Sequence, residues 1–146
     1  MLADNLKILL GSQFAYYSKA HGFHWNVEGS DFYQYHTFFQ VIYEDAYSAI
    51  DPIAEYIRNL GEYAPGSLQR FVELSIIPGQ AKIPKAHLMI EELIADSQTL
   101  ANLLNQCFTD ATQENKQDIA NFIGERLGQT NKFAWQLRST LKDARA

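Results

Sequence analysis

Apolar residues recur along this chain at alternating steps of three and four positions, which is the spacing of residues that share one face of an α-helix. Four such stripes run over residues 6–24, 36–60, 93–107 and 119–141. No alternation of apolar and polar residues of comparable length indicates a β-strand. The pattern therefore predicts an all-α chain with four long helices.

The connections between the stripes differ in length. Residues 28–31 form a short connection between the first two helices, and the last two are expected to meet near residues 110–115. The segment between the second and third helices is long and rich in proline and glycine, and residues 67–74 within it are expected to form a short extra helix. Short, long and short connections predict a four-helix bundle with one crossover, as in ferritin-like folds.

Length and composition limit the classes of protein that this chain can be. Its 146 residues are enough for a single domain spanning residues 1–146, and an apolar content of 47% excludes intrinsic disorder. The single cysteine, Cys107, excludes an intrachain disulfide and a cysteine-based metal site. No apolar run is long enough to span a bilayer, and residues 1–11 do not have the pattern of a signal peptide. We therefore expect a cytoplasmic protein with no membrane partner.

The formal net charge is −5, from 12 basic and 17 acidic residues. This balance argues against strong binding to the phosphate backbone of DNA, because few counterions would be released. Binding of a cation fits the charge better.

Two histidines lie on the apolar stripes, His24 at the end of the first and His36 at the start of the second. They are equally distant from the intervening turn, so an antiparallel hairpin brings them to the same level. A single histidine in a core is most often a hydrogen-bonded packing residue, whereas two at one level favour a metal site.

A polar stripe follows on the second predicted helix. Its members are Gln40, Glu44, Tyr47, Asp51, Glu55 and Arg58. Such a face is usually only solvated, although carboxylates and imidazoles together are ligands suited to iron, manganese or zinc. His36 and Asp51 are 15 residues apart on one helix, or about 22 Å, and cannot hold one ion within a single chain. If they act together, two copies of the helix must pack antiparallel about a two-fold axis near residues 45–46, which gives two intersubunit sites in each dimer.

Several segments resemble the Dps-type mini-ferritins. Residues 19–29, with the sequence His-Trp-Asn at 24–26, resemble the signature of that family, as do the spacing to His36, residues 51–61 and residues 125–139. The resemblance covers nearly the whole chain. It implies a ferritin-like bundle with a short helix in the crossover linker, assembled as a hollow homo-oligomer of twelve chains, a dodecamer built from two-fold dimers.

The resemblance also implies an activity: oxidation of ferrous iron with peroxide at the two-fold interface, followed by storage of ferric mineral inside the cage. His24 and His36 match the histidine ligands, while Asp51 and Glu55 match the carboxylates that the partner chain supplies. These four residues are the expected ferroxidase residues. Iron is the expected metal, with zinc or manganese as alternatives in the same site.

Four aromatic residues accompany these positions. Trp25 matches the tryptophan beside the iron site of the family, although a simple packing role explains it equally well. Tyr17, Tyr43 and Tyr47 are expected to pack in the core, with radical quenching as the alternative.

One departure from the family affects the expected site directly. Gln40 lies one turn after His36, where the family usually has Asp or Glu, and we count it with Glu44 among the expected metal-binding residues. A neutral carboxamide is a poorer ligand for a hard cation, so iron affinity should fall. Glu44 is a candidate substitute, although its carboxylate starts about 6 Å further along the helix.

The second departure lies before the last helix. The family places acidic residues there that are thought to line an iron-uptake pore, whereas this chain has Asn115, Lys116 and Asn121. Glu114 and Asp118 are nearby replacements.

Three functions follow from these observations. The first is a peroxide-consuming ferroxidase and iron store. The alternative is a non-enzymatic or weakened cage with altered metal binding, which serves a structural or macromolecule-binding role. DNA binding is the least supported, because the chain lacks the lysine-rich tails that the family often uses and twelve copies at −5 each would repel DNA.

Overall fold

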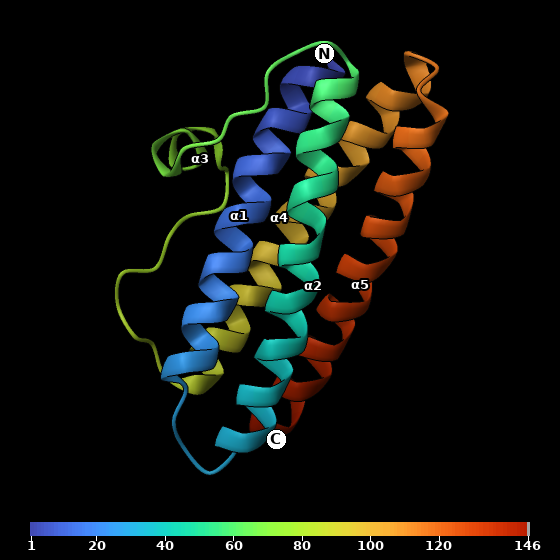
Figure 1. The fold of residues 1–146 in the computed structure, drawn as a ribbon. Helices are drawn as coiled ribbons and strands as arrows, with labels where there is room; N and C mark the ends of the chain where they lie inside the picture. The colour runs from blue at the N-terminus through green and yellow to red at the C-terminus, as the bar shows by residue number, and fades with distance from the viewer. Residues whose placement is uncertain (146) are drawn as a thin grey trace.

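The computed structural model describes the backbone of residues 1–145 and the side chains of residues 1–142 (Figure 1). Its helices are α1 (Leu2–Asn26), α2 (Phe32–Asn59), α3 (Leu68–Leu74), α4 (Ala86–Gln113) and α5 (Gln117–Arg145). None of the described residues lies in a β-strand. The four predicted long helices and the predicted short helix are all confirmed.

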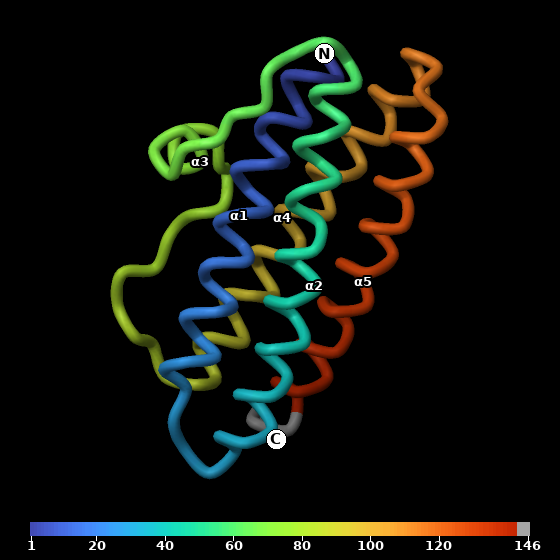
Figure 2. The backbone as a smooth tube through the Cα atoms, viewed as in Figure 1, coloured from blue at the N-terminus to red at the C-terminus, as the bar shows by residue number. Residues whose placement is uncertain are grey.

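The chain path is that of a bundle with one crossover. Figure 2 shows α1 and α2 as one antiparallel hairpin and α4 and α5 as another, with the crossover passing along the outside of α1. Since the crossover spans the length of the bundle, α4 begins at the end where α2 begins and the two helices run parallel. The short α3 in this crossover packs on α1, which also contacts α4. This is the ferritin-like arrangement that the connection lengths predicted.

The core combines members of the predicted stripes with further apolar residues that those stripes did not include. Its largest fully buried side chains are Phe39, Leu2, Leu6, Leu9, Leu10, Ile42, Ile53, Ile57, Met89, Ile90, Leu93 and Leu100. The last helix adds Ile123 and Leu137, both with no exposed surface. Burial of each such side chain stabilises the fold by about 1.5–3 kcal/mol relative to leaving it in water.

Gly11 in the middle of α1 allows α3 to lie against that helix. A Cβ atom at Gly11 would be 2.7 Å from the backbone oxygen of Phe71 and 3.0 Å from the Cβ of Leu74. Next to this contact, Phe14 stacks on Phe71 with ring centroids 4.7 Å apart. The crossover is therefore fixed to the bundle by a close backbone approach and an aromatic contact.

The α1–α2 hairpin, which carries the candidate site, is fixed at its turn and along its length. At the turn, Gly29 has a φ of 119°, and its carbonyl accepts a hydrogen bond from the Phe32 N–H at 3.1 Å. Further along, the buried Gln13 side chain donates to the Ala46 carbonyl at 3.0 Å. Gln13 lies on the predicted apolar stripe and pairs its amide inside the core, which removes the cost of burying it.

Candidate metal-binding site

The two histidines singled out in the sequence lie face to face across the α1–α2 hairpin. The rings of His24 and His36 stack with centroids 3.8 Å apart and planes inclined by 17°. His24 is buried and His36 half-buried. The equal distance of the two residues from the turn thus brings them to one level, as expected from the sequence.

A reciprocal pair of hydrogen bonds fixes the two rings. Nδ1 of His24 bonds to the carbonyl oxygen of His36 at 2.7 Å, and Nδ1 of His36 bonds to the carbonyl oxygen of His24 at 2.7 Å. Because a carbonyl oxygen can only accept, each Nδ1 must carry the proton. In the neutral ring, Nε2 then has its lone pair available, and this is the form in which histidine binds a metal ion. The donor chemistry of the pair therefore fits a metal ion.

His21, which the sequence reasoning did not select, is part of the same cluster. Its ring stacks on Tyr43 with centroids 3.8 Å apart, and its Nδ1 is hydrogen-bonded to the Tyr17 hydroxyl at 2.9 Å. Burial lowers the pKa of His21 below its usual 6.5, and the neighbouring His24 lowers it further. His21 therefore favours its neutral form. Its spacing of four residues from Tyr17 and three from His24 was the available signal, since such residues share a helix face.

The aromatic residues around the histidines are only partly covered. Trp25 lies 4.2 Å from the His21 ring but is 66% exposed. Tyr17 and Tyr43 are half-buried, whereas Tyr47 is 60% exposed although its ring is 5.1 Å from that of Tyr17. The expectation that Tyr47 packs in the core is therefore wrong within one chain. It lies on the polar stripe of α2, and that stripe faces away from the bundle.

Gln40 and Glu44 are hydrogen-bonded to each other on α2. Nε2 of Gln40 donates to Oε1 of Glu44 at 2.9 Å. Gln40 is half-buried, one turn after His36, and Glu44 is exposed. Gln40, which stands where the family usually has a carboxylate, is therefore hydrogen-bonded to Glu44, the residue considered as its substitute.

Asp51 and Glu55 are exposed on α2 and lie far from the histidines of the same chain. His36 and Asp51 are separated by about 22 Å of continuous helix. Within the part of the chain that the structure describes, no three His, Cys, Asp or Glu side chains gather closely enough to hold a metal ion. One chain therefore brings together the two imidazoles but not the two carboxylates.

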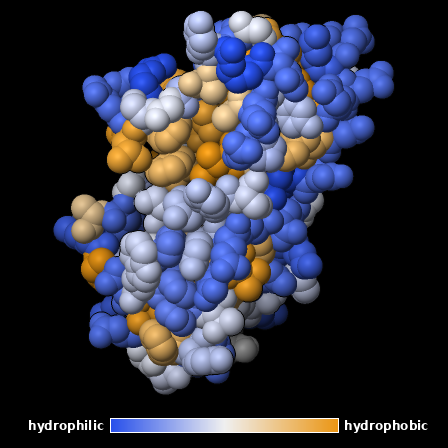
Figure 3. All heavy atoms as spheres, viewed as in Figure 1, coloured by the Kyte–Doolittle hydropathy of each residue, from blue (hydrophilic) through white to orange (hydrophobic). Residues whose placement is uncertain are grey.

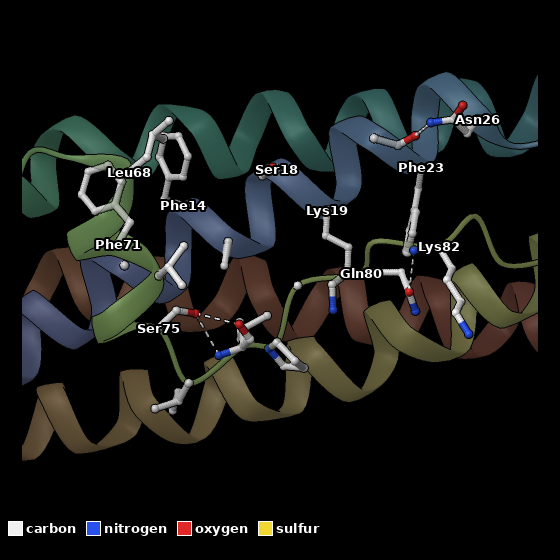
Figure 4. Close-up of a pocket in the computed structure, with 18 of the residues that line it drawn as sticks. Phe14, Ser18, Lys19, Phe23, Asn26, Leu68, Phe71, Ser75, Gln80 and Lys82 are labelled. Carbon is white, nitrogen blue, oxygen red and sulfur yellow. Dashed lines mark hydrogen bonds between the residues drawn. The ribbon is translucent and has the colours of Figure 1, made fainter.

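A large apolar groove lies beside this cluster, between α1, α3 and the crossover (Figure 4). Its volume is about 1060 Å³, and Trp25 lines one end. Lys19 also lines it, but the Lys19 ammonium lies 2.8 Å from Oδ2 of Asp96 on α4. Burial raises the pKa of Asp96, and the contact with Lys19 opposes that rise.

Figure 3 shows apolar residues gathered in the upper part of this face, near α3, whose Leu68 and Val72 are exposed.

The residues that replace the acidic pore lie at the α4–α5 turn. Asn115 has a positive φ of 58°, and Lys116, Asp118 and Asn121 are all exposed. The Glu114 carboxylate accepts a hydrogen bond from the Leu2 N–H at 3.0 Å and thereby caps α1. Glu114 thus has a structural role in the folded chain.

None of the helices in the described part of the chain is both long and apolar enough to cross a membrane.

Known proteins are similar to this chain in sequence and in fold. A family model described as a ferritin-like domain matches residues 3–146. The DNA protection during starvation protein of Helicobacter pylori is 26% identical over 137 residues, covering 93% of this chain and 95% of that protein. An uncharacterized low temperature-induced protein of Nostoc sp. is 30% identical over 143 residues, covering 97% of this chain and 75% of that protein.

The same relationship holds in three dimensions. The crystal structure of Dps from Staphylococcus aureus matches with a TM-score of 0.92 and 27% identity, covering 96% of this chain and 94% of that one. The chain belongs to the ferritin-like family and, within it, to the Dps-type mini-ferritins. Iron storage is the general function that this membership supports.

Proposed function

We propose that this chain binds ferrous iron at a site shared by two protomers, oxidises it with peroxide and stores the ferric product inside a hollow homo-oligomer. The observation that carries the proposal is the reciprocally hydrogen-bonded pair of His24 and His36, because it leaves two Nε2 lone pairs at one level of the bundle. Membership in the Dps-type mini-ferritins supports iron as the metal.

The carboxylates of the proposed site come from a second copy of the chain. Two α2 helices packed antiparallel about an axis near residues 45–46 would place His36 opposite Asp51 of the partner subunit and Glu55 of the partner subunit. The exposure of both carboxylates in one chain supports this assignment, since they lie on a face open to a partner. Each two-fold dimer would then hold two equivalent sites.

The chemistry proposed for the site needs no protein nucleophile. In the overall reaction, two ferrous ions each give up one electron, and hydrogen peroxide takes both electrons with two protons and leaves as two waters. The imidazoles hold the ferrous ion through Nε2, while the anionic oxygens of Asp51 and Glu55 favour the harder ferric product. Asp51 and Glu55 also supply the negative charge that attracts the cation.

Mixed dimers test the shared site directly. One variant would carry His24→Ala with His36→Ala, and the other would carry Asp51→Asn with Glu55→Gln. Each alone should lose peroxide-driven iron oxidation, measured from ferric absorbance after anaerobic loading. Co-expressed with different tags and purified as the mixed species, they should regain activity, because each mixed dimer contains one complete site.

The controls make the outcome decisive. Glu125→Gln removes an exposed carboxylate on α5 and should leave the rate unchanged. An inactive mixed dimer would show that the site is not shared, and an unchanged rate in both parent variants would show that these residues do not form the site. Iron mineral held by an inactive protein would instead favour the weakened cage, which family membership does not favour.

We also propose that the chain assembles into a cage and that this cage does not bind DNA. We expect a cytoplasmic dodecamer built from two-fold dimers, which light scattering would measure as about 200 kDa from chains of 16.7 kDa. The negative charge predicts no retention of DNA, and a gel shift at low salt would detect the opposite.

A further inference from the structure

We propose that each site of this protein holds one divalent cation and that Gln40 is the residue that excludes a second. This inference rests on the proposed shared site and concerns how many ions the site accepts. Di-iron sites in four-helix bundles combine two histidines with about four carboxylates. The proposed site has the two histidines but only two carboxylates, those of Asp51 and Glu55 of the partner subunit.

The charges of the donor set match a single ion. His24 and His36 each donate the Nδ1 proton to a backbone carbonyl, so the two rings bind as neutral ligands. Gln40 is neutral as well, and the two partner carboxylates contribute the only negative charges. Their sum balances one divalent cation. A second cation at about 4 Å, the usual separation in two-metal sites, would bring two further positive charges with no anion to match them.

Glu44, the next carboxylate after Gln40 on this face of α2, is hydrogen-bonded to Gln40 on the side away from the histidines. Glu44 lies two helical turns from His36, or about 12 Å along the axis, and its Oε1 accepts from the Gln40 amide at 2.9 Å. The amide nitrogen of Gln40 is a donor and cannot bind a cation, which leaves one neutral oxygen as its only ligand atom. Gln40 therefore lacks the negative charge that a second ion would need, and its amide is engaged with Glu44.

The test counts metal ions rather than turnover. The assembled protein would be titrated anaerobically with Co²⁺, and separately with Fe²⁺, by calorimetry, with native mass spectrometry to count bound ions. We expect one ion per protomer in the unaltered protein and two in Gln40→Glu. Glu44→Gln should stay at one. Gln34→Glu adds the same charge at an exposed position of α2 two residues before His36, and it should also stay at one.

Each other outcome has a distinct meaning. Two ions per protomer in the unaltered protein would overturn this inference and leave the shared site intact. A fall from two to one in Glu44→Gln would then identify Glu44 as a third carboxylate of the site. One ion in Gln40→Glu would show that Gln40 does not limit the count. No ion in any variant would contradict the proposed function itself.

Discussion

Arg126 of α5 holds Asp45 of α2 through two parallel hydrogen bonds, from Nη1 to Oδ1 at 3.1 Å and from Nη2 to Oδ2 at 2.7 Å. Both side chains are largely buried, with 13% and 25% of their surface exposed. The planar guanidinium matches the carboxylate, and such bidentate pairs fix orientation as well as distance. Asp45 lies in the middle of α2, between the histidine end and the carboxylate end. The pair therefore anchors the helix that carries both halves of the candidate site.

Breaking this pair should destabilise the bundle. Asp45→Asn is expected to lower the free energy of unfolding by about 1.5–3 kcal/mol, because Arg126 keeps a partly buried charge without its anion. Glu125→Gln, at an exposed position within α5, should have little effect. Denaturant unfolding at fixed protein concentration measures both. In a double-mutant cycle with Arg126→Met, the losses in free energy of unfolding of the two single variants should not add up in the double variant. Additive losses would show that the two side chains are not coupled.

Gly11 should tolerate substitution by alanine poorly. Gly11→Ala places a methyl group 2.7 Å from the Phe71 oxygen, so α3 must move, and we expect a loss of about 1–3 kcal/mol. Gly128→Ala on α5 meets no atom within 4 Å and should stabilise the helix by about 0.5–1 kcal/mol. Thermal unfolding of the two variants should shift in opposite directions. A stabilised Gly11→Ala would show that α3 does not rest on α1 in solution.

His21 should make the protein less stable in mild acid. The pKa of His21 is lowered in the folded state, so the unfolded chain binds more protons below about pH 6.5 and stability falls as the pH falls through that region. His21→Gln should reduce the dependence of stability on pH. The free energy of unfolding would be measured at a series of pH values from 7 downward through the region below about pH 6.5. His87→Gln, at an exposed position of α4, is the matched control. An identical pH profile in His21→Gln would contradict the contribution assigned to this histidine.

Cys107 should be inert in the folded protein. It is fully buried on α4, and burial raises the pKa of its thiol to about 12. Since the thiolate is the reactive form, a thiol reagent should label the native protein negligibly at neutral pH. The denatured protein should take up one label per chain. Full labelling of the native protein within minutes would show that α4 opens readily.

Much of the fold could be predicted because it depends on spacing along the chain. The steps of three and four residues located all four long helices, and the long segment after Gly61 predicted the crossover. The meeting of His24 and His36 followed from their equal distance of six residues to the turn centred near Ser30. Each of these inferences uses only positions along a helix and the length of a connection.

The details that the sequence could not provide depend on contacts between distant segments. Gly11 and Phe71 are 60 residues apart, and nothing in their local sequence indicates that their backbones touch. The exchange of hydrogen bonds between His24 and His36 depends on how each ring is turned. Tyr47 was misplaced because α2 carries an apolar and a polar stripe side by side, and an aromatic residue between them fits either face.

The positions of His36 and Asp51 near opposite ends of α2 have a consequence for when iron chemistry can begin. Under the proposed assignment, a newly made chain carries two half-sites about 22 Å apart and cannot complete an oxidation centre by folding alone. Ferrous iron would then be oxidised only where chains have already associated. Assembly would act as a safeguard that confines ferric product to particles able to contain it.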